Sequence, residues 1–247
     1  MDSKPIVVKA TSPEDLQAKF REFLVAQIKV AAAAQQEKMT IGVSGGSMPK
    51  LVCGVLATIT EKDTGYPLSK IFLFACDERL VSLEAGDSNT GSYLQRLPEE
   101  LKRNFASFVN DEDARKSAVL YEKVLRAWNP KTDGSWPVFD LLLLGMGPDG
   151  HTCSLFPGHT LLEEQSVWIA PIEDSPKSPP RRITITLPVI NSAKQVAFIA
   201  TGAGKEEIIK AVIEQKDTQF PVALVQPTRN PVIWFIDEAS GRLLSSL

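Results

Sequence analysis

Two short segments of the chain hold residues whose types and spacing suit chemistry. The first is a turn at residues 44–47, Ser-Gly-Gly-Ser, which follows an apolar run and precedes a predicted helix start at Pro49. Its glycines let backbone N–H groups approach an anion and its hydroxyls can donate hydrogen bonds, so it is typical of a phosphate-binding turn. The second is a loop at residues 145–151, where His151 could act as a general base with Asp149 orienting its ring.

The 44–47 turn also allows a covalent interpretation. Gly42, Ser44 and Gly46 have the G-x-S-x-G spacing of the serine-hydrolase elbow, in which the serine is a nucleophile. In that fold several strands precede the elbow, and the acid and then the histidine follow it. Here about one apolar run precedes Ser44, and both histidines fall mid-sequence. The phosphate interpretation is therefore favoured, and a glycine turn without any ligand stays open.

The 145–151 loop matches the dinucleotide fingerprint G-x-G-x-x-G, but the sequence after it lacks the amphipathic helix that would carry a pyrophosphate. NAD binding is therefore not expected, and the glycines are expected to expose Asp149 and His151 at a strand end. A metal site built from His151, Cys153 and His159 has no further ligand at a recognised spacing. We therefore expect no metal and no other cofactor.

Charged residues follow other apolar runs. Asp77 and Arg79 come directly after the run at 71–76, and Lys205 follows a glycine-rich turn and opens a predicted helix. Each could contact a polar substrate, and a guanidinium offers two parallel donors to a phosphate. Each could also be an ordinary solvated surface charge. Arg181 and Arg182, which end a proline-rich stretch, are further candidates.

Alternating short apolar runs and longer helical patterns must position these residues. They predict one α/β domain over residues 1–247, with a doubly wound, mostly parallel sheet and helices on both faces, a Rossmann-like three-layer sandwich. The chemistry-bearing segments each follow a strand, so they are expected to meet at the carboxyl edge of the sheet. Strands are predicted at 6–8, 40–43, 71–76, 139–144, 167–170, 183–187, 195–201, 223–225 and 232–236, and helices from Ser12 onward and at 49–60, 89–103, 112–128 and 204–215.

Composition narrows the class of protein. The chain is 43% hydrophobic and 23% charged with a net charge of −3, which is typical of a globular protein and argues against nucleic acid or an anionic membrane as partner. The three cysteines form no C-x-x-C pair and are expected to be reduced thiols. No stretch resembles a leader or a membrane span. A cytoplasmic location is expected.

Taken together, these motifs resemble the 6-phosphogluconolactonase family over residues 41–237. The segments that carry the resemblance are SGGS at 44–47, DERLV at 77–81, SN at 88–89, GMGPDGHTCSLFP at 145–157, DSPKSPPRRITITLP at 174–188 and ATGAGK at 200–205, in the order of the family. The histidine-containing segment with its SLFP continuation is the most specific. It distinguishes the family from the related glucosamine-6-phosphate deaminases.

The resemblance implies hydrolysis of 6-phospho-D-glucono-1,5-lactone to 6-phosphogluconate, in the oxidative pentose phosphate pathway and without a metal. Two alternatives stay open: an isomerase or deaminase in which Asp77 shuttles a proton, and a non-catalytic sugar-phosphate sensor. The expected partner is the small phosphorylated lactone alone, and the chain is expected to be a monomer. The implied catalytic residues are His151, Asp149 and Arg79. The implied substrate and phosphate contacts are Ser44, Gly45, Gly46, Ser47, Asp77, Lys205 and Arg182. Arg182 is favoured over Arg181 by its register with the strand that follows.

Overall fold

The computed structural model describes residues 4–106, 108–111, 113–129 and 131–245. Its centre is a six-stranded parallel sheet in the order β1-β11-β10-β7-β2-β3. The strands predicted at 40–43 and 195–201 are confirmed as buried strands, because every residue of β2 and of β10 is buried. The strands are β1 (Ile6–Ala10), β2 (Met39–Val43), β3 (Ile71–Ala75), β7 (Leu141–Gly145), β10 (Val196–Ala200) and β11 (Ile233–Asp237).

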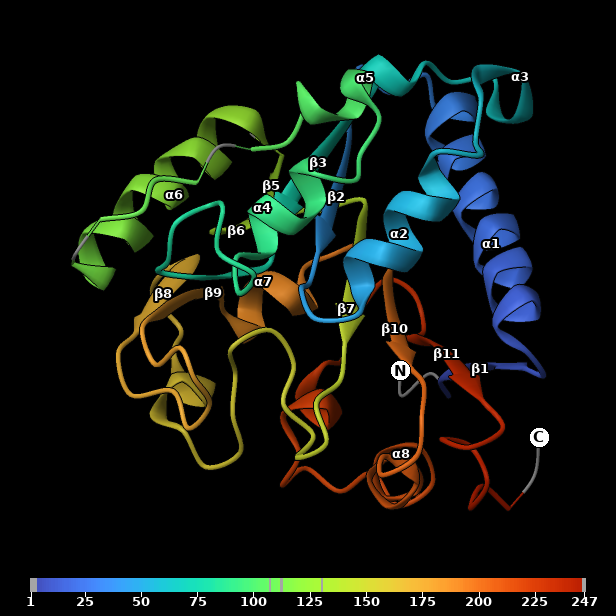
Figure 1. Ribbon diagram of the computed structural model, residues 1–247, viewed down its shortest axis with the longest axis vertical. Coiled ribbons are helices and arrows are strands. Elements are labelled where there is room, and N and C mark those ends of the chain that lie inside the picture. The colour runs from blue at the N-terminus through green and yellow to red at the C-terminus, as the bar shows by residue number, and fades with distance from the viewer. Residues whose placement is uncertain (1–3, 107, 112, 130, 246–247) are drawn as a thin grey trace.

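Helices cover both faces of this sheet. Figure 1 shows α1 and α2 to the right of β2, β3 and β7, and α6 to their left. On one face Phe20 of α1 packs edge-on against Phe235 of β11, and on the other Trp128 of α6 packs against Phe72 and Phe74 of β3. The helices are α1 (Pro13–Ala33), α2 (Met48–Leu56), α3 (Glu61–Thr64), α4 (Asn89–Leu94), α5 (Glu99–Lys102), α6 (Ala114–Trp128), α7 (Leu187–Asn191) and α8 (Glu206–Ile213), with 3₁₀ turns at Leu68–Lys70, Thr160–Glu163 and Pro221–Leu224.

A second, antiparallel sheet stands beside the first. It contains β4 (Asp77–Arg79), β9 (Arg182–Ile185) and β8 (Ile169–Ile172) in the order β4-β9-β8, and α6 packs against β8 and β9. A two-stranded hairpin of β5 (Thr132–Asp133) and β6 (Trp136–Pro137) completes the strands of the described residues. The predicted strands at 167–170 and 183–187 therefore exist, shifted by one or two residues, but outside the parallel sheet.

Two element predictions were wrong, and proline explains part of both. The strand predicted at 223–225 is the end of a 3₁₀ turn, Pro221–Leu224, that packs against α8. Pro221 has a fixed φ and no N–H to give to a ladder, which favours the turn. The helix predicted at 89–103 is two short helices, α4 and α5, because Pro98 cannot continue a helix.

The starts of the two long helices α1 and α6 follow from capping. The side chain of Ser12 accepts a hydrogen bond from the amide of Asp15, and Pro13 occupies the first turn of α1, as predicted. The side chain of Asp113 caps α6 by accepting from the amides of Arg115 and Lys116. The first residue of the predicted helix 112–128 lies outside the described residues.

The order of the parallel strands locates the point where a ligand can bind. From β2 the chain moves outward to β3, whereas from β7 it moves outward in the other direction to β10 and β11. The neighbours β2 and β7 are therefore the switch point of the sheet. Crevices form there because the two connections leave in opposite directions, and the 44–47 turn and the 145–151 loop follow these two strands.

Candidate functional site

A cavity of about 270 Å³ lies at this switch point. It collects the residues that follow four of the parallel strands, as the sequence predicted from their positions. Asp149 and Arg182 are the two predicted site residues that do not line it. The predicted residues that do are Ser44, Gly45, Gly46, Ser47, Asp77, Arg79, His151 and Lys205. A larger cavity of about 370 Å³ lies between the end of α8 and the start of β11.

The 44–47 turn presents backbone donors to the cavity. Gly46 has φ +69°, a conformation that suits glycine, and Ser47 is the N-cap of the nine-residue helix α2. Within the described part of the chain, the amides of Gly46 and Ser47 donate to no protein acceptor. Free amides at a helix N-terminus attract an anion.

Helix α4 fixes the shape of this turn. A Cβ on Gly45 would lie 1.7 Å from Oδ1 of Asn89, so only glycine allows this close approach. Nδ2 of Asn89 in turn donates to the carbonyl of Asp77 at 2.8 Å. The hydroxyl of Tyr93 donates to the carbonyl of Ser44 at 2.8 Å. The turn and the segment that carries Asp77 are thus tied to the same helix.

Lys205 supplies a positive charge beside the turn. It precedes α8 and lines the cavity, and burial lowers its pKa while the charge of Asp237 raises it. Among the described residues Nζ of Lys205 has no ion-pair partner. A desolvated ammonium without a partner is costly unless a ligand neutralises it.

Ser44 is not arranged as a nucleophile. Its Oγ is in weak hydrogen-bond contact with Sγ of Cys153 at 3.8 Å, and no described residue offers it a general base within hydrogen-bond distance. A serine nucleophile needs a base in such contact. The geometry therefore supports the anion-binding interpretation of the turn over the covalent one.

His151 and Asp149 form a hydrogen-bonded dyad. Nδ1 of His151 is in hydrogen-bond contact with Oδ1 of Asp149, and the ring of Phe156 covers the imidazole with centroids 4.7 Å apart. An Nδ1–H that donates to Asp149 leaves Nε2 as the proton acceptor. A Cβ on Gly147 would lie 2.0 Å from the imidazole, so the glycine makes room for the ring.

The surroundings set the charge states of the dyad. Burial lowers the pKa of His151 below its usual value, although Asp149 raises it. Burial raises the pKa of Asp149, but hydrogen bonds from His151 and Lys177 outweigh this and lower it to about 2. At neutral pH the pair therefore consists of a neutral imidazole and a carboxylate, the state that a general base requires.

Lys177 belongs to this cluster, and sequence reasoning missed it. Its Nζ lies 2.9 Å from Oδ1 of Asp149 and 3.2 Å from Nδ1 of His151. It lies in the proline-rich stretch that follows β8 and also contains Arg181 and Arg182. The signal that could have found it is a third cation in the same stretch.

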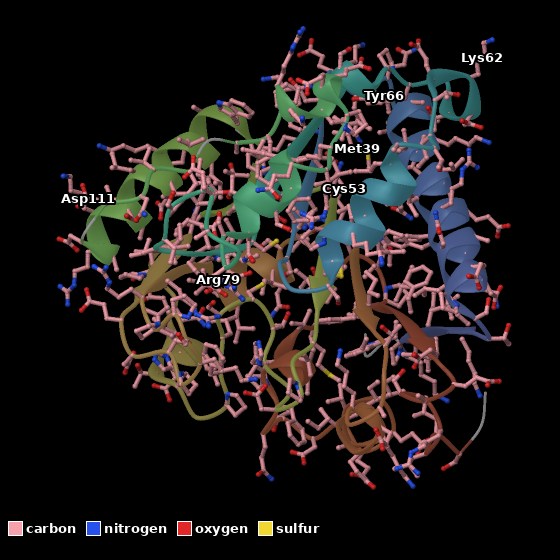
Figure 2. All side chains as sticks on the ribbon, viewed as in Figure 1. Met39, Cys53, Lys62, Tyr66, Arg79 and Asp111 are labelled. Carbon is pink, nitrogen blue, oxygen red and sulfur yellow. The ribbon has the colours of Figure 1, made fainter. Side chains whose placement is uncertain are left out.

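Asp77 and Arg79 close the other side of the cavity. Asp77 is buried and accepts a hydrogen bond from Oγ of Ser154 at 3.0 Å. Nη1 of Arg79 donates to the carbonyl of Asp87 at 2.9 Å, while its buried Nε has no hydrogen-bond partner among the described residues. Figure 2 labels Arg79 near the centre of the view. Nε of Arg79 lies 4.0 Å from Oδ2 of Asp77, and a guanidinium at a cavity wall has further N–H donors suited to a polar ligand.

Arg182 lies outside the cavity lining. Its side chain is buried, and its Nε and Nη2 donate to the carbonyls of Pro179, Lys177 and Ser178. These contacts hold the proline-rich stretch in place. Its predicted contact with a phosphate stays a prediction.

Glu78 is the structural anchor of this region. Its buried carboxylate accepts from the amides of Arg79, Asn89 and Thr90, and burial raises its pKa although these hydrogen bonds lower it. We expect Glu78→Ala to lower the free energy of unfolding by about 1–3 kcal/mol, because buried amides lose their acceptor. Urea denaturation measures this, with exposed Glu84→Ala as the control. Equal midpoints for the two variants would contradict this role.

No group of three or more His, Cys, Asp or Glu side chains in residues 4–245, apart from the gaps given above, is arranged to hold a metal ion. None of the described helices has the length and apolar character needed to cross a membrane.

The fold and the cavity define an α/β protein with a glycine-rich turn and a hydrogen-bonded His–Asp pair at the switch point of its sheet. A model of the family described as glucosamine-6-phosphate isomerases/6-phosphogluconolactonase matches residues 11–234, and the chain belongs to this family. It is 41% identical to the 6-phosphogluconolactonase of Bos taurus and 40% identical to that of Homo sapiens, each match covering 95% of this chain and 92% of the relative. The solved 6-phosphogluconolactonase from Trypanosoma cruzi superimposes with a TM-score of 0.84 at 26% identity, covering 100% of this chain and 99% of that one. The resemblance drawn from the motifs is confirmed.

Proposed function

We infer that the chain hydrolyses 6-phospho-D-glucono-1,5-lactone to 6-phosphogluconate, a step of the oxidative pentose phosphate pathway. Similarity over nearly the full length of relatives named 6-phosphogluconolactonase supports this. The observation that carries it is that His151, a neutral imidazole paired with the carboxylate of Asp149, lines the same cavity as the 44–47 turn and Lys205. This cavity can bind a dianion at one end and activate water at the other.

The phosphate end of the substrate fits the 44–47 turn. The free amides of Gly46 and Ser47 and the ammonium of Lys205 would bind the phosphate oxygens. Binding of this non-reacting end orients the lactone ring toward His151. Orientation of this kind lowers the barrier without taking part in bond making.

The reacting end faces the dyad and Arg79. Nε2 of His151 takes a proton from water as the water oxygen attacks C1 of the lactone, and the carbonyl oxygen becomes an oxyanion. Arg79 or backbone N–H groups stabilise this oxyanion, and Asp149 stabilises the imidazolium. The imidazolium then returns its proton to the ring oxygen as the C1–O bond breaks. A δ-lactone is a reactive ester, so general-base help of about 10²–10⁴-fold suits it.

Acid release in a pH-stat from freshly made phosphogluconolactone tests this function. We expect turnover well above the spontaneous rate of ring opening. Ammonia release from glucosamine 6-phosphate is the comparison assay, because Asp77 lies in the cavity and could shuttle a proton in a deaminase. Ammonia release without acid release would overturn the lactonase proposal, and a melting shift without turnover would favour a sensor.

Lys205→Gln is expected to raise KM by about 10- to 100-fold while kcat changes little. The ammonium donates charge-assisted hydrogen bonds to the phosphate and takes no part in the activation of water. Hydrogen bonds to charged groups contribute about 1.5–3 kcal/mol. Steady-state kinetics on the lactone measures the split. Lys210→Gln, on α8 beyond the cavity lining, is the matched control. A fall in kcat at unchanged KM would contradict a binding role for Lys205.

Further parts of the proposal concern the whole molecule. We propose that the chain acts as one domain and as a monomer in the cytoplasm, with the phosphorylated lactone as its partner and without a metal or other cofactor. Analytical ultracentrifugation tests the monomer. Full activity after exhaustive dialysis against EDTA is expected, and activity restored only by an added metal would contradict this.

A further inference from the structure

The stretch between β8 and β9 places Lys177 against the His151–Asp149 dyad. Its Nζ lies 2.9 Å from Oδ1 of Asp149 and 3.2 Å from Nδ1 of His151. The same Oδ1 is the hydrogen-bond partner of Nδ1. Lys177 is not among the residues that line the cavity, so it approaches the dyad on the Nδ1 side, away from the nitrogen that would meet water.

The backbone beneath Lys177 is held by buried contacts. Nη2 of Arg182 donates to the carbonyl of Lys177 at 2.8 Å and to that of Ser178 at 3.2 Å. Oγ of Ser175 also donates to the carbonyl of Lys177 at 2.9 Å. Because Arg182 is only 2% exposed, its guanidinium is held in place and fixes the two carbonyls that it contacts. The backbone of Lys177 is therefore fixed in position, unlike the backbone of an ordinary surface lysine in a loop.

The position of the ammonium has two consequences for the imidazole. Lys177 and the Nδ1–H of His151 donate to one carboxylate oxygen, which restricts how Asp149 can rotate. The positive charge beside Nδ1 also repels an imidazolium, and Lys177 lowers the pKa of His151 together with burial. Asp149 from the same loop and Asp77 from β4 act in the opposite direction. Lys205 and Arg79 are the other cations that line the same cavity as His151.

We propose that Lys177 is a positioning residue, which holds the carboxylate of Asp149 against Nδ1 of His151 and keeps a positive charge beside the base. The inference rests on the proposed lactonase function, in which neutral His151 accepts a proton at Nε2. Protonation of the imidazole abolishes this role, so activity is lost as the pH falls through the pKa of His151. Lys177 therefore extends activity toward acid pH.

The first test is the pH profile of kcat/KM for lactone hydrolysis. For Lys177→Met we expect the acid limb to move to higher pH by about one unit, the scale of one nearby, partly solvated charge, with KM within a few-fold of the parent. Lys177→Arg keeps the charge and should restore the acid limb. Lys62→Met is the control, because Lys62 lies at a far corner of the molecule from Arg79 (Figure 2). A uniform loss of activity without a shifted limb would show a merely structural role and overturn the proposal.

The second test needs no substrate. The chain has two histidines, so His159→Gln leaves the imidazole of His151 as the only one to follow by NMR titration. Adding Lys177→Met should raise the titration midpoint of His151 by a similar amount. An unchanged or lower midpoint overturns the inference even where the parent protein hydrolyses the lactone. If the titration midpoint of His151 rises but the parent protein does not hydrolyse the lactone, the proposed function is refuted. The effect of Lys177 on the dyad would still be supported.

Discussion

Replacing His151 with alanine is expected to lower kcat for lactone hydrolysis by about 10²–10⁴-fold while KM changes by no more than a few-fold. The imidazole is the cavity-lining group that can take a proton from water at neutral pH, and general-base catalysis has this magnitude. The phosphate contacts of the 44–47 turn and Lys205 remain, so binding persists. Steady-state kinetics in a pH-stat, corrected for spontaneous ring opening, measures the effect.

His159→Ala is the matched control for this variant. Nε2 of His159 pairs with exposed Asp174, and its Nδ1 accepts from the amide of Leu161, both outside the cavity. Its kcat should stay near that of the parent protein. A His151→Ala protein with full kcat and a raised KM would show that the imidazole binds substrate and does not activate water.

Gly147→Ala is expected to lower kcat by about 10²-fold with little change in melting temperature. The new methyl group would lie 2.0 Å from Cε1 and Nδ1 of His151 and 2.8 Å from Oδ1 of Asp149. These atoms belong to side chains that can turn aside, and the φ of Gly147 is not in the left-handed region, so the backbone tolerates alanine. The ring must move by an ångström or more, and a displacement of this size costs catalysis about 10²-fold.

Gly54→Ala separates this effect from glycine replacement as such. Gly54 lies inside α2, and a Cβ there meets no atom within 4 Å. Alanine is the better helix former, so we expect an unchanged kcat and an unfolding free energy raised by up to about 1 kcal/mol. Thermal melts and steady-state kinetics on Gly147→Ala and Gly54→Ala measure both expected effects. Full activity of Gly147→Ala would mean that the dyad can repack around the methyl group.

Local sequence patterns were sufficient for most of the fold. The runs at 71–75 and 141–144 are apolar at every position, which is typical of strands covered on both faces, and the structure has them in the parallel sheet. The strand at 223–225 was wrong because a short apolar run fits a strand and a buried turn equally well. The antiparallel pairing of β8 and β9 could not be predicted, because pairing depends on contacts between distant segments.

Much of the candidate site was also visible in the sequence. The 44–47 turn, Asp77, Arg79, His151 and Lys205 were found because each follows a strand, and they line one cavity. The roles of Lys177 and Arg182 could not be told apart in the same way. Both are cations of one proline-rich stretch, and nothing in their spacing says which ammonium or guanidinium turns toward the dyad.

The sequence by itself determined the strand and helix pattern, the glycine positions and the chemistry available at the ends of the strands. These depend on short-range sterics and on the periodicity of apolar residues, which a linear sequence carries directly. Only the tertiary structure decided that Lys177 contacts Asp149 while Arg182 is buried under the loop. The positions of these two cations depend on the pairing of β4 with β9 and on which carbonyls of the folded loop need a hydrogen-bond donor. Both arise only when distant segments of the chain meet.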